Sequence, residues 1–173
     1  EAIIDVPIVV PHTSAGIALL FVFGRRFFMG ESFEPLGIEF VGAEPGIVIA
    51  MMFVSVPFLI DSAKDGFRAV DPRLEKVART LGASPWRTFF TISVPLAWRS
   101  IVSGSVMMWA RGMSEFGAVI ILTYNPKILP TLAYEWFTSY GLSRGGSVAV
   151  LTVLVALAIF ITLRVIVQRG ERA

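Results

Sequence analysis

Four long apolar stretches constrain this chain more than any other feature. A membrane-spanning helix needs about 20 predominantly apolar residues, because lipid offers the backbone no hydrogen-bond partners outside the helix. Apolar residues make up 55% of the 173 positions, above the roughly 45–50% of soluble domains. We therefore predict an all-α, polytopic transmembrane helical bundle that forms a single domain over residues 1–173. The expected spans are residues 6–24, 46–62, 101–122 and 146–164.

Three details of the sequence refine the prediction of these spans. Pro7 and Pro11 are expected to kink the first turns of the first span. The uninterrupted part of the second span, residues 46–60, would reach only about 23 Å as a helix, so we expect it to continue past Asp61. The sequence begins at Glu1, directly before apolar residues and without the basic region of a signal peptide. We therefore expect a chain truncated at its N-terminus.

The basic residues predict how the chain lies in the membrane. Lysine and arginine concentrate in cytoplasmic loops. The connection over residues 63–99 and the C-terminal tail carry ten of them, against four on the opposite side. We therefore predict a multi-pass protein of the cell membrane whose C-terminus and 63–99 connection are cytoplasmic. The ten are Lys64, Arg68, Arg73, Lys76, Arg79, Arg87, Arg99, Arg164, Arg169 and Arg172.

Composition argues against enzymatic chemistry. The chain has no cysteine and a single histidine, His12, which is expected to be a packed or hydrogen-bonded helix residue. It lacks the GxxxxGK[ST] sequence that cradles nucleotide phosphates, so any ATP has to be bound by another subunit. An integral-membrane enzyme, the distant alternative, would have to use Asp5, His12, Arg111 and Glu115, which show no recognised catalytic spacing. We expect no catalytic residue, no metal and no cofactor.

The 63–99 connection carries signals for two short capped helices. Asp71 before Pro72 is an N-cap followed by a proline in the first turn, and Ser84 before Pro85 repeats the pattern. Gly82 lies between them, where a helix end requires positive φ. Three interpretations compete: an amphipathic interfacial loop, a DNA-binding helix-turn-helix, and a docking element for a cytoplasmic motor. A loop tied at both ends to membrane helices cannot easily enter a major groove, so we expect no nucleic acid.

The same connection resembles the "EAA" loop of bacterial and archaeal ABC-importer permeases. That pattern is Glu-Ala-Ala, three residues, Gly, nine residues, then Ile-x-Leu-Pro. Here the glycine is Gly82, and Lys76 stands where glutamate is usual, one residue after Glu75. The resemblance implies a coupling helix that is seated in a cleft of an ATPase subunit. The residues expected to form this coupling loop are Glu75, Lys76, Ala78, Gly82, Ala83, Ser84 and Pro95.

The third span contains two charges. Arg111 and Glu115 are four residues apart, which predicts that they share one face of a helix. A charge at the bilayer centre costs about 3 kcal/mol on insertion scales. Either the two residues pair with each other or with another helix, or together with Ser114 they line or gate an ion path.

The third span also resembles oxyanion permeases for sulfate, molybdate and tungstate, in the stretch WARGMSEFGA. The opening AIIDVPIVVPHTSAGIALL is similar to the molybdate/tungstate branch. The resemblance implies a type I ABC-importer permease for molybdate or tungstate, which would work as a permease homodimer with two ATPases and an extracytoplasmic oxyanion-binding protein. A permease of the same superfamily for sulfate or another small solute is the alternative, and a secondary transporter is a further one that would not depend on ATP.

Overall fold

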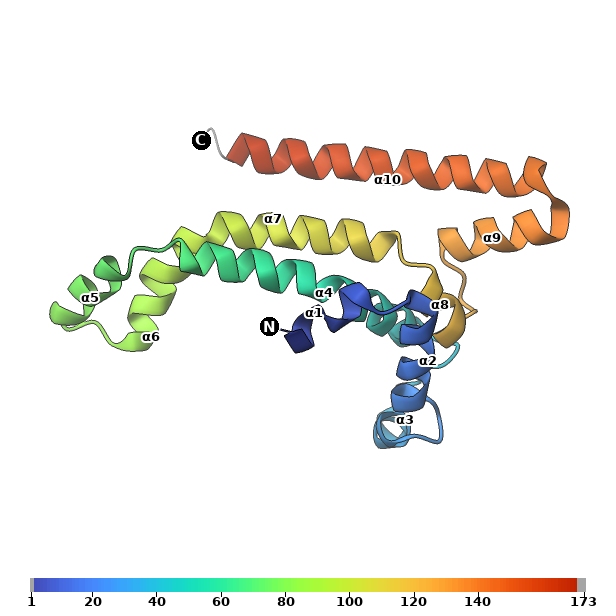
Figure 1. Ribbon diagram of the computed structural model, residues 1–173, viewed down its shortest axis with the longest axis horizontal. Coiled ribbons are helices and arrows are strands. Elements are labelled where there is room, and N and C mark those ends of the chain that lie inside the picture. The colour runs from blue at the N-terminus through green and yellow to red at the C-terminus, as the bar shows by residue number, and fades with distance from the viewer. Residues whose placement is uncertain (1, 171–173) are drawn as a thin grey trace.

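The protein is built from helices that lie mostly along one long axis (Figure 1). The computed structural model describes residues 2–170, which contain no β-strand. Arg172 of the basic tail lies outside the described residues. The helices and the lack of strands in the described residues confirm the predicted all-α fold. The helices are α1 (Ala2–Val9), α2 (His12–Phe23), α3 (Phe28–Phe33), η1 (Glu34–Leu36), α4 (Glu44–Arg68), α5 (Pro72–Thr80), α6 (Pro85–Thr88), η2 (Phe89–Ser93), α7 (Val94–Met113), α8 (Gly117–Leu122), α9 (Leu129–Tyr140) and α10 (Leu142–Gly170).

The helices α4 and α7 run side by side and form the central pair of the fold (Figure 1). Small residues allow the close approach: a Cβ at Gly104 would lie 2.7 Å from the Cβ of Ser62. Across the same seam, the Ser62 hydroxyl donates a 2.7 Å hydrogen bond to the carbonyl of Ser100. Small residues and hydroxyl bonds are the usual means by which helices associate in lipid.

The core lies where α2 and α8 meet α4. It consists of buried apolar side chains from these three helices, and α2 packs directly against α8. This packing brings residues from the start of the chain to the break that follows α7. The buried members are Leu19, Ala50, Val54, Ala118, Val119 and Leu122.

The first predicted span is broken rather than kinked. Instead of one helix over residues 6–24, the chain forms α1 and α2, which meet at 119°. Pro11 precedes α2 with an extended backbone at ψ 129°, and its ring nitrogen has no hydrogen to donate to the preceding turn. Pro7 is tolerated inside α1, so the two prolines have different effects.

The third predicted span is interrupted too, so the expectation of one helix over residues 101–122 is wrong. The helix α7 begins earlier, at Val94, and ends at Met113, and α8 begins at Gly117. Glu115 lies in the break, where one of its carboxylate oxygens accepts the backbone N–H of Ala118 at 2.9 Å. A side chain that caps the next helix in this way competes with continuation of the previous one.

The second and fourth spans are continuous and longer than predicted. The helix α4 runs to Arg68 and so extends past Asp61, as expected. Within the described residues, α4 and the Leu142–Arg164 part of α10 are each long and apolar enough to cross a membrane. The pair of α1 and α2 adds a third candidate if the two helices count as one span.

The helices α5 and α6 form a hairpin at one end of the long axis (Figure 1). Because α4 ends at Arg68 and α7 begins at Val94, the connection between them is shorter than the predicted 63–99. The carboxyl end of α10 points toward the same end of the molecule, whereas α8 and the turn from α9 to α10 lie at the opposite end (Figure 1).

Candidate functional site

The hairpin over residues 71–93, which we call the coupling hairpin, has the caps that the sequence predicts. The Asp71 carboxylate accepts a 2.9 Å hydrogen bond from the backbone N–H of Arg73. The Ser84 hydroxyl accepts one of 3.3 Å from the backbone N–H of Arg87. Gly82, between the helices, has φ 90° and nothing within 4 Å of where a Cβ would stand. Residues with a Cβ rarely adopt this backbone conformation, so glycine determines the turn.

Several large apolar side chains of the coupling hairpin are mostly exposed. Leu81 at its tip is 83% exposed and Trp86 is 73% exposed. An open groove of about 510 Å³ lies between α5, η2 and the start of α7, and Leu74, Val77 and Pro95 are among the residues that line it. Exposed apolar surface of this kind marks an interaction site.

One side-chain hydrogen bond ties α5 to the helix that leads into the membrane. The buried Ser93 hydroxyl donates to a carboxylate oxygen of Glu75 over 2.6 Å. Ser93 ends η2, a π-helical turn that joins α6 to α7, and such turns are frequent at functional positions. Sequence reasoning selected Glu75 but missed Ser93, because the two are 18 positions apart.

The other predicted coupling residues surround this link. Lys76 and Ala78 lie on α5, Ala83 and Ser84 lie in the turn, and Pro95 lies in the first turn of α7. Lys76 and Ser84 are exposed, and Ala78 is half-buried. The structure thus brings the predicted set together on one hairpin and its junction with α7.

The second group of predicted residues gathers at the break between α7 and α8. A guanidinium nitrogen of Arg111, Nη1, lies 3.2 Å from Oε2 of Glu115 and also donates to the Ser114 hydroxyl at 3.3 Å. The Glu115 side chain is 1% exposed and that of Arg111 is 23% exposed. Pairing of these two charges was one of the two interpretations left open by the sequence. They meet although Glu115 lies beyond the end of α7 and not on its face.

His12 is the fourth member of this cluster, and the sequence did not predict its place there. Its Nε2 lies 2.7 Å from Nη2 of Arg111, and its Nδ1 lies 4.0 Å from Oε2 of Glu115. We call His12, Arg111, Ser114 and Glu115 the ionic junction. His12 and Arg111 are 99 positions apart, and the one clue in the sequence was a histidine placed directly after a proline within an apolar stretch.

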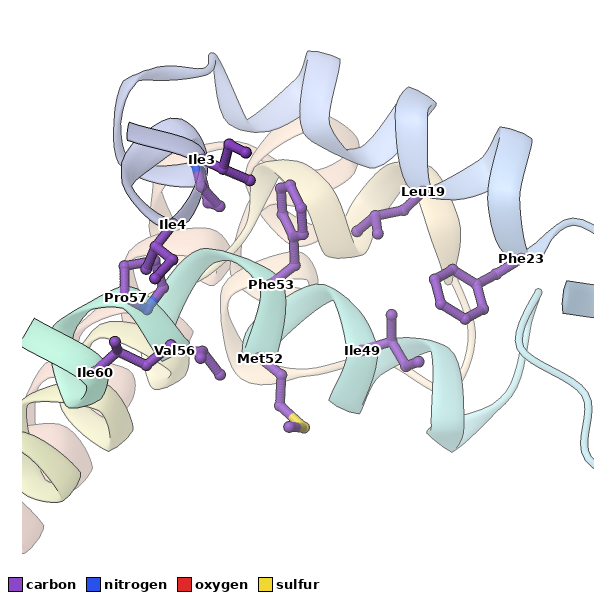
Figure 2. A pocket seen from close by; sticks show the side chains of 11 residues that line it. Ile3, Ile4, Leu19, Phe23, Ile49, Met52, Phe53, Val56, Pro57 and Ile60 are labelled. Carbon is purple, nitrogen blue, oxygen red and sulfur yellow. The ribbon is translucent and has the colours of Figure 1, made fainter. Parts of the chain in front are cut away.

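The apolar pocket between α1, α2 and α4 is a poor site for an anion. It has a volume of about 390 Å³ and lies between α1, α2 and α4, where Ile3, Ile4 and Phe53 are among its lining side chains (Figure 2). None of the side chains that line it is charged. Anion binding requires hydrogen-bond donors or positive charge, so the ionic junction is the better candidate for contact with an ion.

At the opposite end from the coupling hairpin, Lys127 forms an ion pair with Glu135 of α9. The hydrogen bond between the two raises the pKa of Lys127 above its usual value and lowers the pKa of Glu135. The ammonium group also lies 5.3 Å from the centre of the Tyr124 ring. This pair fixes the loop before α9 to the helix itself.

Comparison with known proteins gives one family. The family model described as "Binding-protein-dependent transport system inner membrane component" matches residues 1–171. The molybdate/tungstate transport system permease protein WtpB of Pyrococcus abyssi is 47% identical over 171 residues, which are 99% of this chain and 64% of that protein. The chain therefore spans about 64% of the length of this relative.

More distant relatives carry names for two kinds of cargo. The molybdenum transport system permease protein ModB of Escherichia coli K12 is 34% identical over 163 residues, covering 91% of this chain and 71% of that protein. The probable sulfate transport system permease protein cysT of Chlorokybus atmophyticus is 31% identical over 165 residues, covering 93% of this chain and 57% of that protein.

Proposed function

The chain belongs to the family of binding-protein-dependent transport system inner membrane components, and from this membership we propose that it is the permease subunit of an ATP-driven importer for molybdate or tungstate. The observation that carries the proposal is the 47% identity to a molybdate/tungstate permease over 99% of the chain. The permease supplies a path and a gate across the membrane. ATP hydrolysis takes place on separate subunits, and the chain performs no chemistry on its cargo.

The family description implies a binding protein and an ATPase as partners, and we further propose how many copies of each take part. Two copies of the permease enclose one pore, two ATPase subunits bind on the cytoplasmic side, and an extracytoplasmic binding protein delivers the oxyanion. The coupling hairpin and the C-terminus face the cytoplasm. The excess of lysine and arginine around these two segments supports that orientation, as does their position at one end of the long axis (Figure 1).

The coupling hairpin is the contact to the ATPase. Its apolar groove and its exposed Leu81 fit a cleft on a partner protein. The hydrogen bond from Ser93 to Glu75 makes α5 and the entry to α7 move together. Closure of the ATPase pair around bound ATP would therefore be passed to α7 as a movement of a stiff element.

The ionic junction is the part of the permease that meets or gates the ion. Arg111 supplies the hydrogen-bond donors that an oxyanion requires, while Glu115 neutralises its charge when no ion is present. Ser114 accepts from Arg111 in the same break. Interrupted helices with polar groups at the break are the usual construction of ion sites within membranes.

Reconstituted uptake tests this function. The full-length permease is placed in liposomes with its ATPase and its binding protein, and uptake of tungstate, molybdate and sulfate is measured with and without ATP. We expect ATP-dependent uptake of tungstate or molybdate that excess sulfate does not suppress. ATP-dependent uptake of sulfate instead would support the importer function but assign it a different cargo. Uptake that does not depend on ATP, with all components folded, would refute the proposal that the complex is an ATP-driven importer.

Sulfate is the second candidate cargo. The 31% identity to a probable sulfate permease supports it, and that identity extends over 93% of the chain. It is weaker than the 47% identity to the molybdate/tungstate protein. The competition measurement above separates the two cargoes.

A further inference from the structure

The contact between His12 and Arg111 fixes the protonation state of the histidine. A guanidinium carries only donors, so in the 2.7 Å contact Nη2 of Arg111 donates and Nε2 of His12 accepts. The imidazole is therefore neutral, and its hydrogen is on Nδ1. This tautomer directs the Nδ1 hydrogen to the side of the ring that faces Glu115.

The other side of the imidazole is poised for a different contact. Nδ1 of His12 and Oε2 of Glu115 are 4.0 Å apart, longer than the 2.7–3.2 Å of a typical hydrogen bond. Both atoms are buried and have no hydrogen-bond partner among the described residues. A donor and an acceptor thus face each other across a gap that a shift of about 1 Å would close.

The cluster joins two interrupted segments of the fold. His12 is the first residue of α2, directly after the 119° bend, and Arg111 lies in the last turn of α7, directly before the break at Glu115. A single contact between side chains therefore connects the ends of two helices from distant parts of the chain. Such a contact can decide how the two breaks lie relative to each other.

We propose that neutral His12 is a positioning residue that holds Arg111 at the ionic junction, and that protonation of His12 releases Arg111 and slows transport. The proposal rests on the transport function argued above. A protonated imidazole has no acceptor at Nε2, so the bond from Arg111 is replaced by repulsion between two cations. The Glu115 carboxylate, 4.0 Å from Nδ1, then attracts the imidazolium and is drawn away from Arg111.

The charged neighbours of His12 support this direction of change. Among the described residues, its charged contacts are with Arg111 from α7 and Glu115 from the break. Backbone and apolar groups of α8 pack against the first turn of α2 and bring no further charge. Protonation therefore changes one attraction and one repulsion within this group of three side chains.

The pH dependence of uptake tests the proposal. Three full-length permeases are compared in the reconstituted complex between pH 8 and pH 5.5, the range in which imidazoles titrate: wild type, His12→Gln and His12→Leu. Glutamine can offer an acceptor near the position of Nε2 but does not titrate. The ATPase and the binding protein are identical in all three complexes. Their own pH dependence therefore cancels when the uptake rate of each variant is divided by that of wild type at the same pH.

We expect wild-type uptake to fall by roughly tenfold on acidification, the equivalent of one hydrogen bond to a charged group, while the His12→Gln variant keeps most of its rate. The His12→Leu variant should be slow at every pH. Parallel pH profiles for wild type and His12→Gln would overturn the proposal. A wild-type complex without ATP-dependent uptake at any pH would instead refute the transport function.

A second measurement separates the contact from transport. Thermal unfolding of the full-length permease in detergent is followed for wild type, His12→Leu, Arg111→Lys and the double variant. If His12 positions Arg111, the two substitutions are not additive, because each removes the same contact. Additive shifts of the melting temperature would overturn the proposal even if uptake depends on pH.

Discussion

The coupling hairpin and the ionic junction place their side chains in opposite environments. The hairpin leaves large apolar groups in solvent, with Leu81 83% exposed and Trp86 73% exposed. The junction places charged groups inside the protein and balances them there, with Glu115 1% exposed beside Arg111. The hairpin thus presents apolar surface on which a partner can be expected, whereas the junction pairs its charges within one chain.

This difference predicts different consequences of mutation. A change on the hairpin should leave the permease folded and inserted but break its connection to the ATPase. A change at the junction should affect both folding and transport, because a buried charge that loses its partner is costly. The four predictions below test this division, and they run from the largest expected effect to the smallest.

The largest effect is expected for Gly82→Asp in the coupling hairpin. It adds a Cβ at φ 90° and a negative charge at the surface we assign to ATPase contact. ATP-dependent uptake should be abolished, while membrane insertion and the melting temperature stay close to wild type. Gly37→Asp is the matched control, because Gly37 also has positive φ, 71°, and open space around it. Normal uptake with Gly82→Asp would refute the assignment of the hairpin.

Arg111→Ala should be the most damaging change at the junction. It leaves Glu115 buried without its cation and removes the hydrogen bond to His12. Loss of one partner of a buried ion pair costs about 3–5 kcal/mol, so both the melting temperature and uptake should fall. Arg87→Ala, on the exposed hairpin, is the control and should change the melting temperature little. Equal thermal stability of the two variants would erase the contrast between hairpin and junction.

Ser93→Ala is expected to have an intermediate effect, because it removes the bond that links α5 to the entry of α7. A hydrogen bond to a charged group contributes about 1.5–3 kcal/mol, so the hairpin should become less rigidly attached. Fewer oxyanions should be imported per ATP hydrolysed, although hydrolysis continues. Thr91→Val is the control, since the Thr91 hydroxyl donates to the carbonyl of Arg87, four residues earlier, and does not link α5 to α7. Glu75→Gln should have the same effect as Ser93→Ala. If neither variant changes the number of oxyanions imported per ATP hydrolysed, the hydrogen bond between Ser93 and Glu75 does not transmit movement.

The sequence predicted the coupling hairpin more completely than the ionic junction, and the reason is distance along the chain. The caps at Asp71 and Ser84 and the turn at Gly82 depend on contacts between residues at most three positions apart. The contact of His12 with Arg111 spans 99 positions. Periodicity and capping rules contain no information about which distant helices meet, so the sequence predicted a packed or hydrogen-bonded His12 but not its partner, Arg111.

The helix breaks show a second limit. Apolar composition pointed to α4 and α10, which are long and apolar enough to cross a membrane, but composition does not change at Ser114 or Glu115 enough to end a helix. The break exists because Glu115 caps α8 and pairs with Arg111, which are tertiary arrangements. By contrast, Pro11 was visible in the sequence, and only the size of the bend it accompanies was not.

The smallest effect is expected at the ion pair of Lys127 and Glu135, because both of its side chains, 28% and 27% exposed, are partly reached by solvent, which weakens a salt bridge. The raised pKa of Lys127 stabilises the fold below its usual value of 10.5, and this contribution is lost as pH rises through the raised pKa. The lowered pKa of Glu135 stabilises it above 4.5, and that contribution is lost as pH falls through the lowered pKa. Glu135→Gln should therefore lower the melting temperature slightly and by a constant amount from pH 6 to pH 9. The difference from wild type should shrink below about pH 4.5, whereas a loss as large as that of Arg111→Ala would contradict the contrast between this partly exposed pair and the pair that contains the buried Glu115.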